Sequence, residues 1–136
     1  MACLDTSFLI DLIRSGASTR RRRATDKLRE LLARGEYLTT SRFNVAELLV
    51  GVYRSDDPER ELRSVDALLQ NLTVLEFGPE AARLFARITA LLQQQGKPAG
   101  DMDVLIASTA LVAGESLVTA NPTHFRNVPG LTVDTY

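Results

Sequence analysis

Asp5 is a carboxylate at a position where negative charge is costly unless a cation or a hydrogen-bond donor meets it. Residues 2–10 begin with a short apolar run, reach Asp5, pass through Thr6 and Ser7, and then resume an apolar pattern with helical spacing. We therefore predict that Asp5 ends a buried strand and that Thr6 or Ser7 caps the next helix. Ligands of open α/β sheets bind at the carboxyl ends of the strands, so Asp5 indicates an acidic site there.

Glu47 and Asp103 are two further carboxylates in apolar sequence. Glu47 has apolar neighbours on almost every side, and Asp103 lies near the start of an otherwise apolar segment. Charged side chains in such surroundings are rarely buried unless they are paired. Each also has an ordinary explanation: Glu47 faces solvent or pairs with Arg42 or Arg54, and Asp103 meets the positive end of a helix dipole.

Strands and helices alternate along the chain in a way that brings these acids together. The predicted strands are 2–5, 37–40, 72–77, 116–119 and 131–133. The predicted helices are a first one that ends near Ser15, then 21–34, 42–52 capped by Ser41, 58–69, 79–95, and one from 101 or 103 to 112. This order predicts a single α/β domain over 1–136, with a mostly parallel central sheet of about five strands flanked by helices.

Composition excludes several classes of protein. With 136 residues, of which 45% are hydrophobic, the chain is long and apolar enough for a globular core. Its longest apolar runs span only a few residues, so we expect no membrane span and no signal peptide. Cys3 has no internal disulfide partner, which favours the cytoplasm, and we expect it to be a small buried hydrophobe.

The predicted topology can place Asp5, Glu47 and Asp103 at one edge of the sheet. Oxygen-only ligation with open positions suits Mg²⁺ or Mn²⁺, which also take the oxygens of a substrate phosphate. A zinc site is not expected, because neither Cys3 nor His124 has partners at a suitable spacing. Glycine-rich phosphate loops are absent, and metal-assisted phosphodiester hydrolysis is the chemistry that remains.

Four segments, in order along the chain, resemble the PIN domain family. They are residues 4–7 (Leu-Asp-Thr-Ser), residues 45–48 (Val-Ala-Glu-Leu) followed by Gly51, residues 103–107 (Asp-Val-Leu-Ile-Ala), and residues 117–131. The last segment, which contains Leu-Val-Thr-Ala-Asn and later His124-Phe125, is similar to the end of the VapC toxins in particular. The resemblance covers essentially the whole chain.

The resemblance implies a ribonuclease toxin that depends on Mg²⁺ or Mn²⁺, forms a homodimer and is neutralised by a cognate VapB-like antitoxin. Asp5, Glu47 and Asp103 fall on the family's acidic positions and are the expected catalytic residues and metal ligands. Where the family often has a fourth acid, this chain has Asn121, and Asp101 is the candidate to compensate. The expected reaction is one-step hydrolysis of RNA by a water that the cation activates.

Other residues are candidates to bind the substrate or the partner. Thr6, Ser7, Thr119 and Asn121 are expected to position the scissile phosphate or a water, although caps and strand ends use the same residue types. The basic run Arg20, Arg21, Arg22 and Arg23 is either a solvated helix start or a contact to RNA or antitoxin. An apolar surface that contains Phe43, Leu48, Leu49, Val52 and Tyr53 is either core or a groove for an antitoxin helix.

Two other functions are compatible with the sequence. One is a PIN-fold nuclease that processes RNA outside any toxin pair. The other is a module that binds ligands in an acidic pocket without turnover. A receiver-like domain, which also carries acids at strand ends, is disfavoured because this chain lacks the paired N-terminal acids and the late strand-end lysine.

Overall fold

Five parallel strands form a sheet at the centre of the computed structural model, which describes residues 1–14, 16–97 and 99–136. Their order across the sheet is β3-β2-β1-β4-β5. The strands are β1 (Ala2–Leu4), β2 (Leu38–Ser41), β3 (Thr73–Leu75), β4 (Ser116–Val118) and β5 (Val133–Asp134). The predicted α/β fold with a parallel sheet of about five strands is confirmed, and β5 is at an edge.

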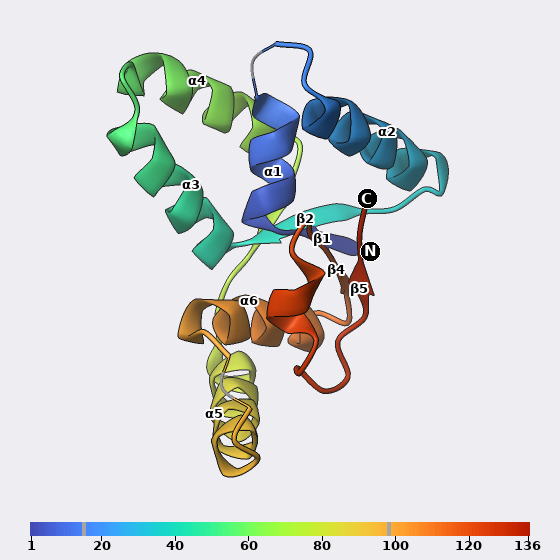
Figure 1. Cartoon of the computed structure of the whole chain (residues 1–136), viewed down its shortest axis with the longest axis vertical. Helices are drawn as coiled ribbons and strands as arrows, with labels where there is room; N and C mark the ends of the chain where they lie inside the picture. Colours follow the sequence, from blue (N-terminus) through green and yellow to red (C-terminus); the bar gives the residue numbers. More distant parts are fainter. Residues whose placement is uncertain (15, 98) are drawn as a thin grey trace.

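Helices cover both faces of this sheet (Figure 1). They are α1 (Thr6–Ile13), α2 (Thr19–Ala33), α3 (Arg42–Arg54), α4 (Pro58–Leu69), α5 (Pro79–Gln94), α6 (Asp101–Val112) and the short 3₁₀ helix η1 (Pro122–Phe125). The first four helices lie on one side of the sheet, and α5 and α6 lie on the other. Among the described residues, none of the helices has the length and apolar character that a membrane crossing requires.

The strand β1 separates two apolar cores because successive side chains of a strand point to opposite faces. Ala2 and Leu4 pack with Phe8, Leu9 and the helices α2, α3 and α4. Cys3 points the other way and packs with α5, α6 and η1. All three residues of β1 are fully buried, so the expectation of a buried Cys3 is confirmed.

Several predicted boundaries are wrong by a few residues. The second helix begins at Thr19 instead of residue 21, because the Ser18 hydroxyl caps it by accepting a hydrogen bond from the Arg21 N–H over 3.1 Å. The strand β3 ends at Leu75, since Phe77 turns away to pack edge-to-face on Phe43. The last strand begins two residues later than predicted and ends one residue later. The predicted helix end at Ser15 lies outside the described residues.

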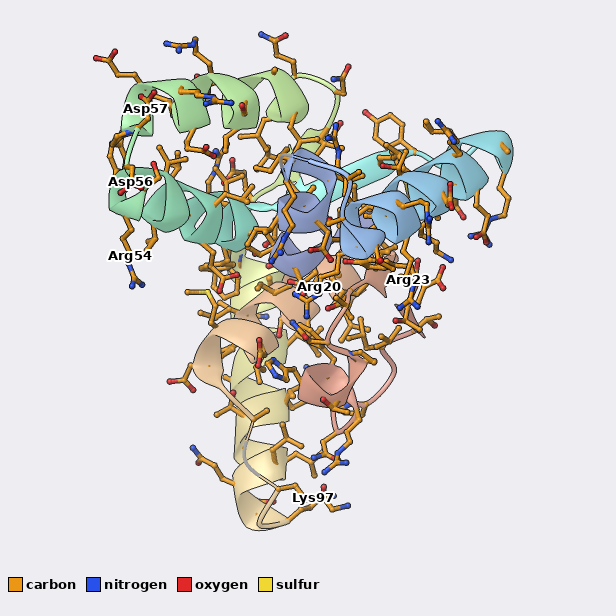
Figure 2. The ribbon with its side chains drawn as sticks, turned by 45° about the horizontal axis from the view of Figure 1, so that its top comes forward. Arg20, Arg23, Arg54, Asp56, Asp57 and Lys97 are labelled. Atoms are coloured by element: carbon orange, nitrogen blue, oxygen red, sulfur yellow. The ribbon has the colours of Figure 1, made fainter. Side chains whose placement is uncertain are left out.

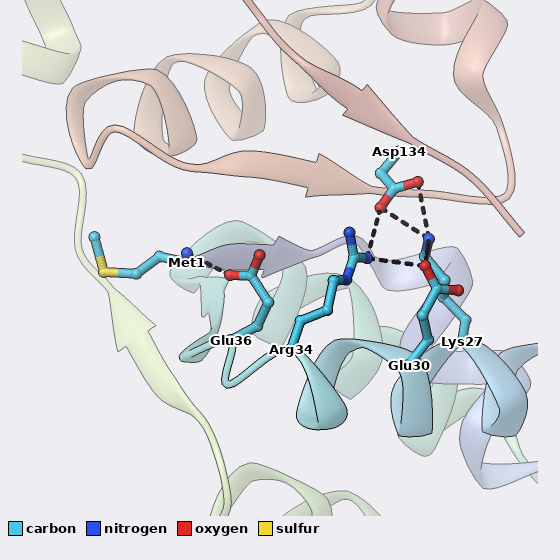
Figure 3. Close-up of polar contacts among 6 residues, drawn as sticks. All are labelled: Met1, Lys27, Glu30, Arg34, Glu36 and Asp134. Atoms are coloured by element: carbon cyan, nitrogen blue, oxygen red, sulfur yellow. Dashed lines mark hydrogen bonds and ion pairs between the residues drawn. The ribbon is translucent and has the colours of Figure 1, made fainter.

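Charged side chains connect α2 to β5 (Figure 3). The Lys27 ammonium, only 8% exposed, lies 2.9 Å from the Asp134 carboxylate and 3.5 Å from that of Glu30. Arg34 contacts the same two carboxylates. Because β5 has only two residues in the sheet, these ion pairs add a second attachment of the C-terminal segment to the fold.

Candidate active site

Asp5 stands between β1 and α1, at the carboxyl end of a central strand. Its N–H donates to the Val118 carbonyl over 2.9 Å, and its carbonyl accepts the first hydrogen bond of α1, from Leu9. Asp5 is therefore the N-cap of α1, and the prediction that Thr6 or Ser7 caps this helix is wrong. The Asp5 side chain makes no capping bond, which leaves its carboxylate free for other donors.

Three side chains from three parts of the chain donate to the buried Asp5 carboxylate. Asn44 Nδ2 lies 3.0 Å from Oδ1, Thr119 Oγ1 lies 2.7 Å from Oδ2, and Ser7 Oγ lies 3.2 Å from Oδ2. Hydrogen bonds to an ionised acceptor are among the stronger ones in proteins. They compensate the burial of a carboxylate that is only 6% exposed and fix both of its oxygens.

Glu47 projects from α3 toward the same edge of the sheet. One of its oxygens accepts a hydrogen bond from Thr6 Oγ1 over 2.6 Å. Burial raises the pKa of Glu47, and the negative charges of Asp5 and Asp103 raise it further, while the Thr6 hydrogen bond opposes the shift. Glu47 therefore lies close enough to both Asp5 and Asp103 for their charges to affect its pKa.

Asp103 lies in the first turn of α6, half-buried. Burial is the main cause that raises the pKa of Asp103, and the charge of Asp5 adds to it. The imidazole of His124 opposes the shift from 3.6 Å away. The structure therefore brings Asp5, Glu47 and Asp103 within electrostatic reach of one another, from β1, α3 and α6.

The donor set of this acidic site fits a hard divalent cation. In the arrangement seen in residues 1–14, 16–97 and 99–136, no three carboxylate, imidazole or thiol groups converge closely enough to ligate one ion. Glu47 is turned to Thr6, and Asp103 to His124. Ligation by all three acids thus requires side-chain rotation. A cation would offset the burial of Glu47 and Asp103, the main cause of their raised pKa, and the smaller repulsion from neighbouring acids.

Asn44 is a site residue that sequence reasoning missed. It is completely buried, and its amide nitrogen contacts both Asp5 and Thr6 Oγ1, the latter over 2.9 Å. Its amide oxygen accepts from the Ser41 hydroxyl and N–H in a capping box at the start of α3. A signal existed in the sequence, because Ser41 and Asn44 have capping-box spacing directly after a strand.

Thr119 and Ser7 connect the acids to the end of β4. Their hydroxyls lie 3.2 Å apart. Ser7 Oγ accepts the Ala120 N–H over 3.0 Å, and Thr119 Oγ1 accepts the Asn121 N–H over 3.0 Å. Both hydroxyls therefore orient Asp5 and the loop after β4.

Asn121 and Asp101 differ from these residues in their contacts. The side chain of Asn121 is exposed beside Ser7. Asp101 is the first, exposed residue of α6, and it is not among the charges that raise the pKa of Glu47 or Asp103. Its predicted role as a fourth ligand stays a prediction.

Comparison with known protein families shows which family this chain matches. The model of the PIN domain matches residues 2–131, which include Asp5, Glu47, Asp101 and Asp103. The chain belongs to the PIN domain family. Named relatives place it beside VapC: it is 32% identical to "Ribonuclease VapC2" of Haemophilus influenzae over 133 residues, which cover 98% of this chain and 96% of the relative.

A second relative and two solved structures agree with this placement. "tRNA(fMet)-specific endonuclease VapC" of Shigella flexneri is 32% identical over 128 residues, covering 94% of this chain and 92% of the relative. VapBC2 from Rickettsia felis, crystallised with a DNA fragment from its promoter, superposes with a TM-score of 0.87 at 27% identity, covering 99% of this chain and 98% of that one. DNA-bound VapBC from Salmonella typhimurium gives 0.84 at 29% identity, covering 98% and 96%.

Two surfaces of this PIN domain border the acids. A cleft of about 370 Å³ between α1, the start of α2 and the loop after β4 includes Ser7 and Asn121. The arginine run does not act as a unit here, because Arg20 and Arg23 line this cleft whereas Arg21 and Arg22 line another depression.

The other surface is a groove of about 420 Å³ between α1, α3 and α4, with Glu47 in its wall. Of the predicted apolar surface, Leu48 and Val52 line this groove. Phe43 instead packs with the core under α5 and α6, and Tyr53 is 68% exposed. The predicted surface is therefore divided between groove, core and solvent.

Proposed function

We propose that this chain is a cytoplasmic, Mg²⁺- or Mn²⁺-dependent endoribonuclease that acts as the toxin of a VapBC-type pair. The observation that carries the proposal is the meeting of Asp5, Glu47 and Asp103 at the carboxyl edge of a parallel sheet, where burial, together with the charge of Asp5, raises the pKa of Glu47 and of Asp103. The names of the VapC relatives, a ribonuclease and an endonuclease, support the same reaction.

Each acid has a role in this reaction that follows from its contacts. When bound, the divalent cation supplies Lewis acidity, which lowers the pKa of a water and neutralises phosphate charge. Asp5 is the fixed ligand, because Asn44, Ser7 and Thr119 hold its carboxylate. Glu47 and Asp103 are adjustable ligands, because each has one partner to leave, Thr6 for Glu47 and His124 for Asp103.

The decisive experiment compares purified wild type with Asp5→Asn, Glu47→Gln and Asp103→Asn. We expect RNA cleavage that requires Mg²⁺ or Mn²⁺, stops with a chelator, and falls at least about a hundredfold in each variant. Asp66→Asn, an exposed acid on α4, is the matched control and keeps full activity. Cleavage retained by all three site variants contradicts the site, and metal binding without any cleavage favours the non-catalytic module.

The RNA target is found by sequencing the new 5′ ends that appear after induced expression. Since one relative carries the name tRNA(fMet)-specific endonuclease, initiator tRNA is the first defined substrate to test. Cuts concentrated in one RNA identify a specific endonuclease. Uniform degradation of all RNA contradicts a specific target.

We propose that an antitoxin helix occupies the groove between α1, α3 and α4. The groove combines apolar side chains from α1, α3 and α4 with charged ones, so a helix with an apolar face and charged flanks, including a basic residue beside Glu47, fits it. The charged residues that line it are Glu47, Glu61, Arg14 and Arg60. Co-expression with the small protein encoded beside this gene is expected to restore growth and to give a stable complex. Growth arrest that no neighbouring protein relieves favours the RNA-processing alternative.

We also propose that the active form is a homodimer, which sedimentation equilibrium of the purified protein tests directly. A molar mass twice that of the 15.0 kDa chain is expected. A monomer at all concentrations contradicts this part of the proposal.

A further inference from the structure

Arg20 and Arg23 lie on one side of α2, three residues apart, so their side chains extend from the same helix face. Figure 2 shows both on the side of α2 that is turned toward the C-terminal part of the chain. They line the cleft of about 370 Å³ together with Ser7, Arg14, Asn121 and Tyr136. Three guanidinium groups, two from α2 and one from Arg14 directly after α1, therefore border one cavity.

This cleft is continuous with the acidic site. Ser7 lines the cleft, and the same hydroxyl lies 3.2 Å from Asp5 Oδ2. Asn121 also lines the cleft, and its N–H donates to Thr119, which in turn donates to Asp5. An RNA strand that is bound over Asp5 can therefore continue into the cleft past Ser7 and Asn121.

A buried carboxylate holds one of the three arginines in place. Asp11 is 3% exposed, and its Oδ1 lies 3.3 Å from Arg14 Nε. Its other oxygen accepts a hydrogen bond from the Tyr136 hydroxyl over 2.6 Å. Tyr136 itself packs edge-to-face on Phe8 in the core, so Arg14 is fixed to a rigid support.

The other two arginines have no such partner. Among the described residues, no carboxylate lies within ion-pair distance of Arg20 or Arg23, and both side chains are exposed. They stand near the N-terminal end of α2, where the helix dipole disfavours positive charge. Of the described residues that line the cleft, three carry guanidinium groups and one, Asp11, carries a side-chain carboxylate, so these side chains give the cleft excess positive charge, which fits an anion.

We propose that Arg14, Arg20 and Arg23 bind the RNA phosphate that adjoins the scissile one. The inference rests on the proposed ribonuclease function and adds residues that bind the backbone beside the metal-binding acids. Guanidinium groups bind phosphate oxygens through paired N–H donors, which suits a site made of arginines. An RNA backbone is favoured over an acidic peptide because Ser7, which lines the cleft, lies 3.2 Å from Asp5, beside which the proposed function places the scissile phosphate.

The test uses two double variants with equal changes of charge on the same helix. Arg20→Gln with Arg23→Gln removes two arginines from the cleft, and Arg21→Gln with Arg22→Gln removes two that line the other depression. Binding of a fluorescent single-stranded RNA of about 20 nucleotides is measured in an Asp103→Asn background, which prevents cleavage. Cleavage rates are measured with Asp103 present.

We expect the double variant Arg20→Gln with Arg23→Gln to bind RNA at least about tenfold more weakly than wild type and to lose the same factor in kcat/KM. Because these arginines are assigned to a single phosphate, the slope of log affinity against log salt becomes shallower by about 0.7. The double variant Arg21→Gln with Arg22→Gln changes RNA affinity less than about twofold, because charges farther from the RNA are screened at physiological salt. Mn²⁺ affinity and melting temperature stay at wild-type values in both pairs.

Three other results would contradict either the assignment of the cleft or the proposed function. Equal behaviour of the two pairs overturns the assignment of the cleft while cleavage by wild type upholds the proposed function. Weaker antitoxin binding with unchanged RNA binding assigns the cleft to an acidic protein segment and also overturns it. A wild-type protein that neither binds nor cleaves RNA contradicts the proposed function itself.

Discussion

Asn44 Nδ2 donates a hydrogen bond to Asp5 Oδ1 over 3.0 Å, which joins the start of α3 to the end of β1. The same nitrogen lies 2.9 Å from Thr6 Oγ1, and Thr6 in turn donates to Glu47. One buried amide therefore sets the positions of two acids that come from different elements. This makes Asn44 a positioning residue for the whole acidic site.

Replacing Asn44 with Ala is expected to reduce RNA cleavage and to lower the free energy of unfolding by about 1–3 kcal/mol. The reason is that the Asp5 carboxylate and the hydroxyl and N–H of Ser41 lose their hydrogen-bond partner at a buried position. Urea unfolding and Mn²⁺ titration measure the two effects, and weaker Mn²⁺ binding is the readout specific to positioning. Asn71→Ala, an exposed asparagine after α4, is the control that changes neither.

Replacing Asn121 with Asp is expected to tighten Mn²⁺ binding about fivefold, since an added charge contributes about 1 kcal/mol at 4 Å in water. The backbone N–H of Asn121 donates to Thr119, the residue that donates to Asp5, so position 121 adjoins the acidic site and we expect a carboxylate there to add to its negative charge. Isothermal titration calorimetry measures the change. Asn71→Asp adds the same charge elsewhere, and an equal gain in both variants would show a non-local effect.

Glu115, which lies outside the active site, is expected to make the free energy of unfolding depend on pH. It is buried and accepts a hydrogen bond from Thr39; burial raises its pKa above the ordinary value of 4.5, and the hydrogen bond opposes this shift. A raised pKa means that the folded protein holds the proton more tightly than the unfolded chain. The Glu115 contribution to stability is therefore fully present below pH 4.5 and is lost as pH rises through the raised pKa.

Glu115→Gln keeps an acceptor for Thr39 and removes the charge. We expect this variant to melt at a higher temperature than wild type at about pH 7, with the difference shrinking at about pH 4, where Glu115 is protonated. Thermal unfolding followed by circular dichroism across this range provides the test. Asp66→Asn, an exposed acid, should follow the wild-type pH curve, and a constant difference between Glu115→Gln and wild type would contradict the assignment.

Asp134→Ala is expected to lower the free energy of unfolding by about 1–3 kcal/mol, because it removes the 2.9 Å partner of the buried Lys27 ammonium. Asp26→Ala serves as control: its partner Arg29 is 3.7 Å away and both side chains are exposed, so a change within about 0.5 kcal/mol is expected. Urea unfolding of both variants measures the contrast. Equal effects would mean that burial of Lys27 does not matter.

The identities of the three acids and the alternation of strands and helices follow from local sequence. Asp5, Glu47 and Asp103 stand out because carboxylates interrupt apolar segments, and a segment's periodicity depends on its own residues. The parallel sheet follows from the order of those segments. These features were therefore predictable before any three-dimensional arrangement was known.

The partners of those acids were decided by tertiary structure alone. Asn44 reaches Asp5 only because α3 starts where β2 ends beside β1, a distance of 39 residues along the chain. Likewise, Arg20 and Arg23 differ from Arg21 and Arg22 only in which side of α2 faces the cleft. Sequence determines which residues share a helix face, but the rotation of that helix against its neighbours is set by packing of the whole core.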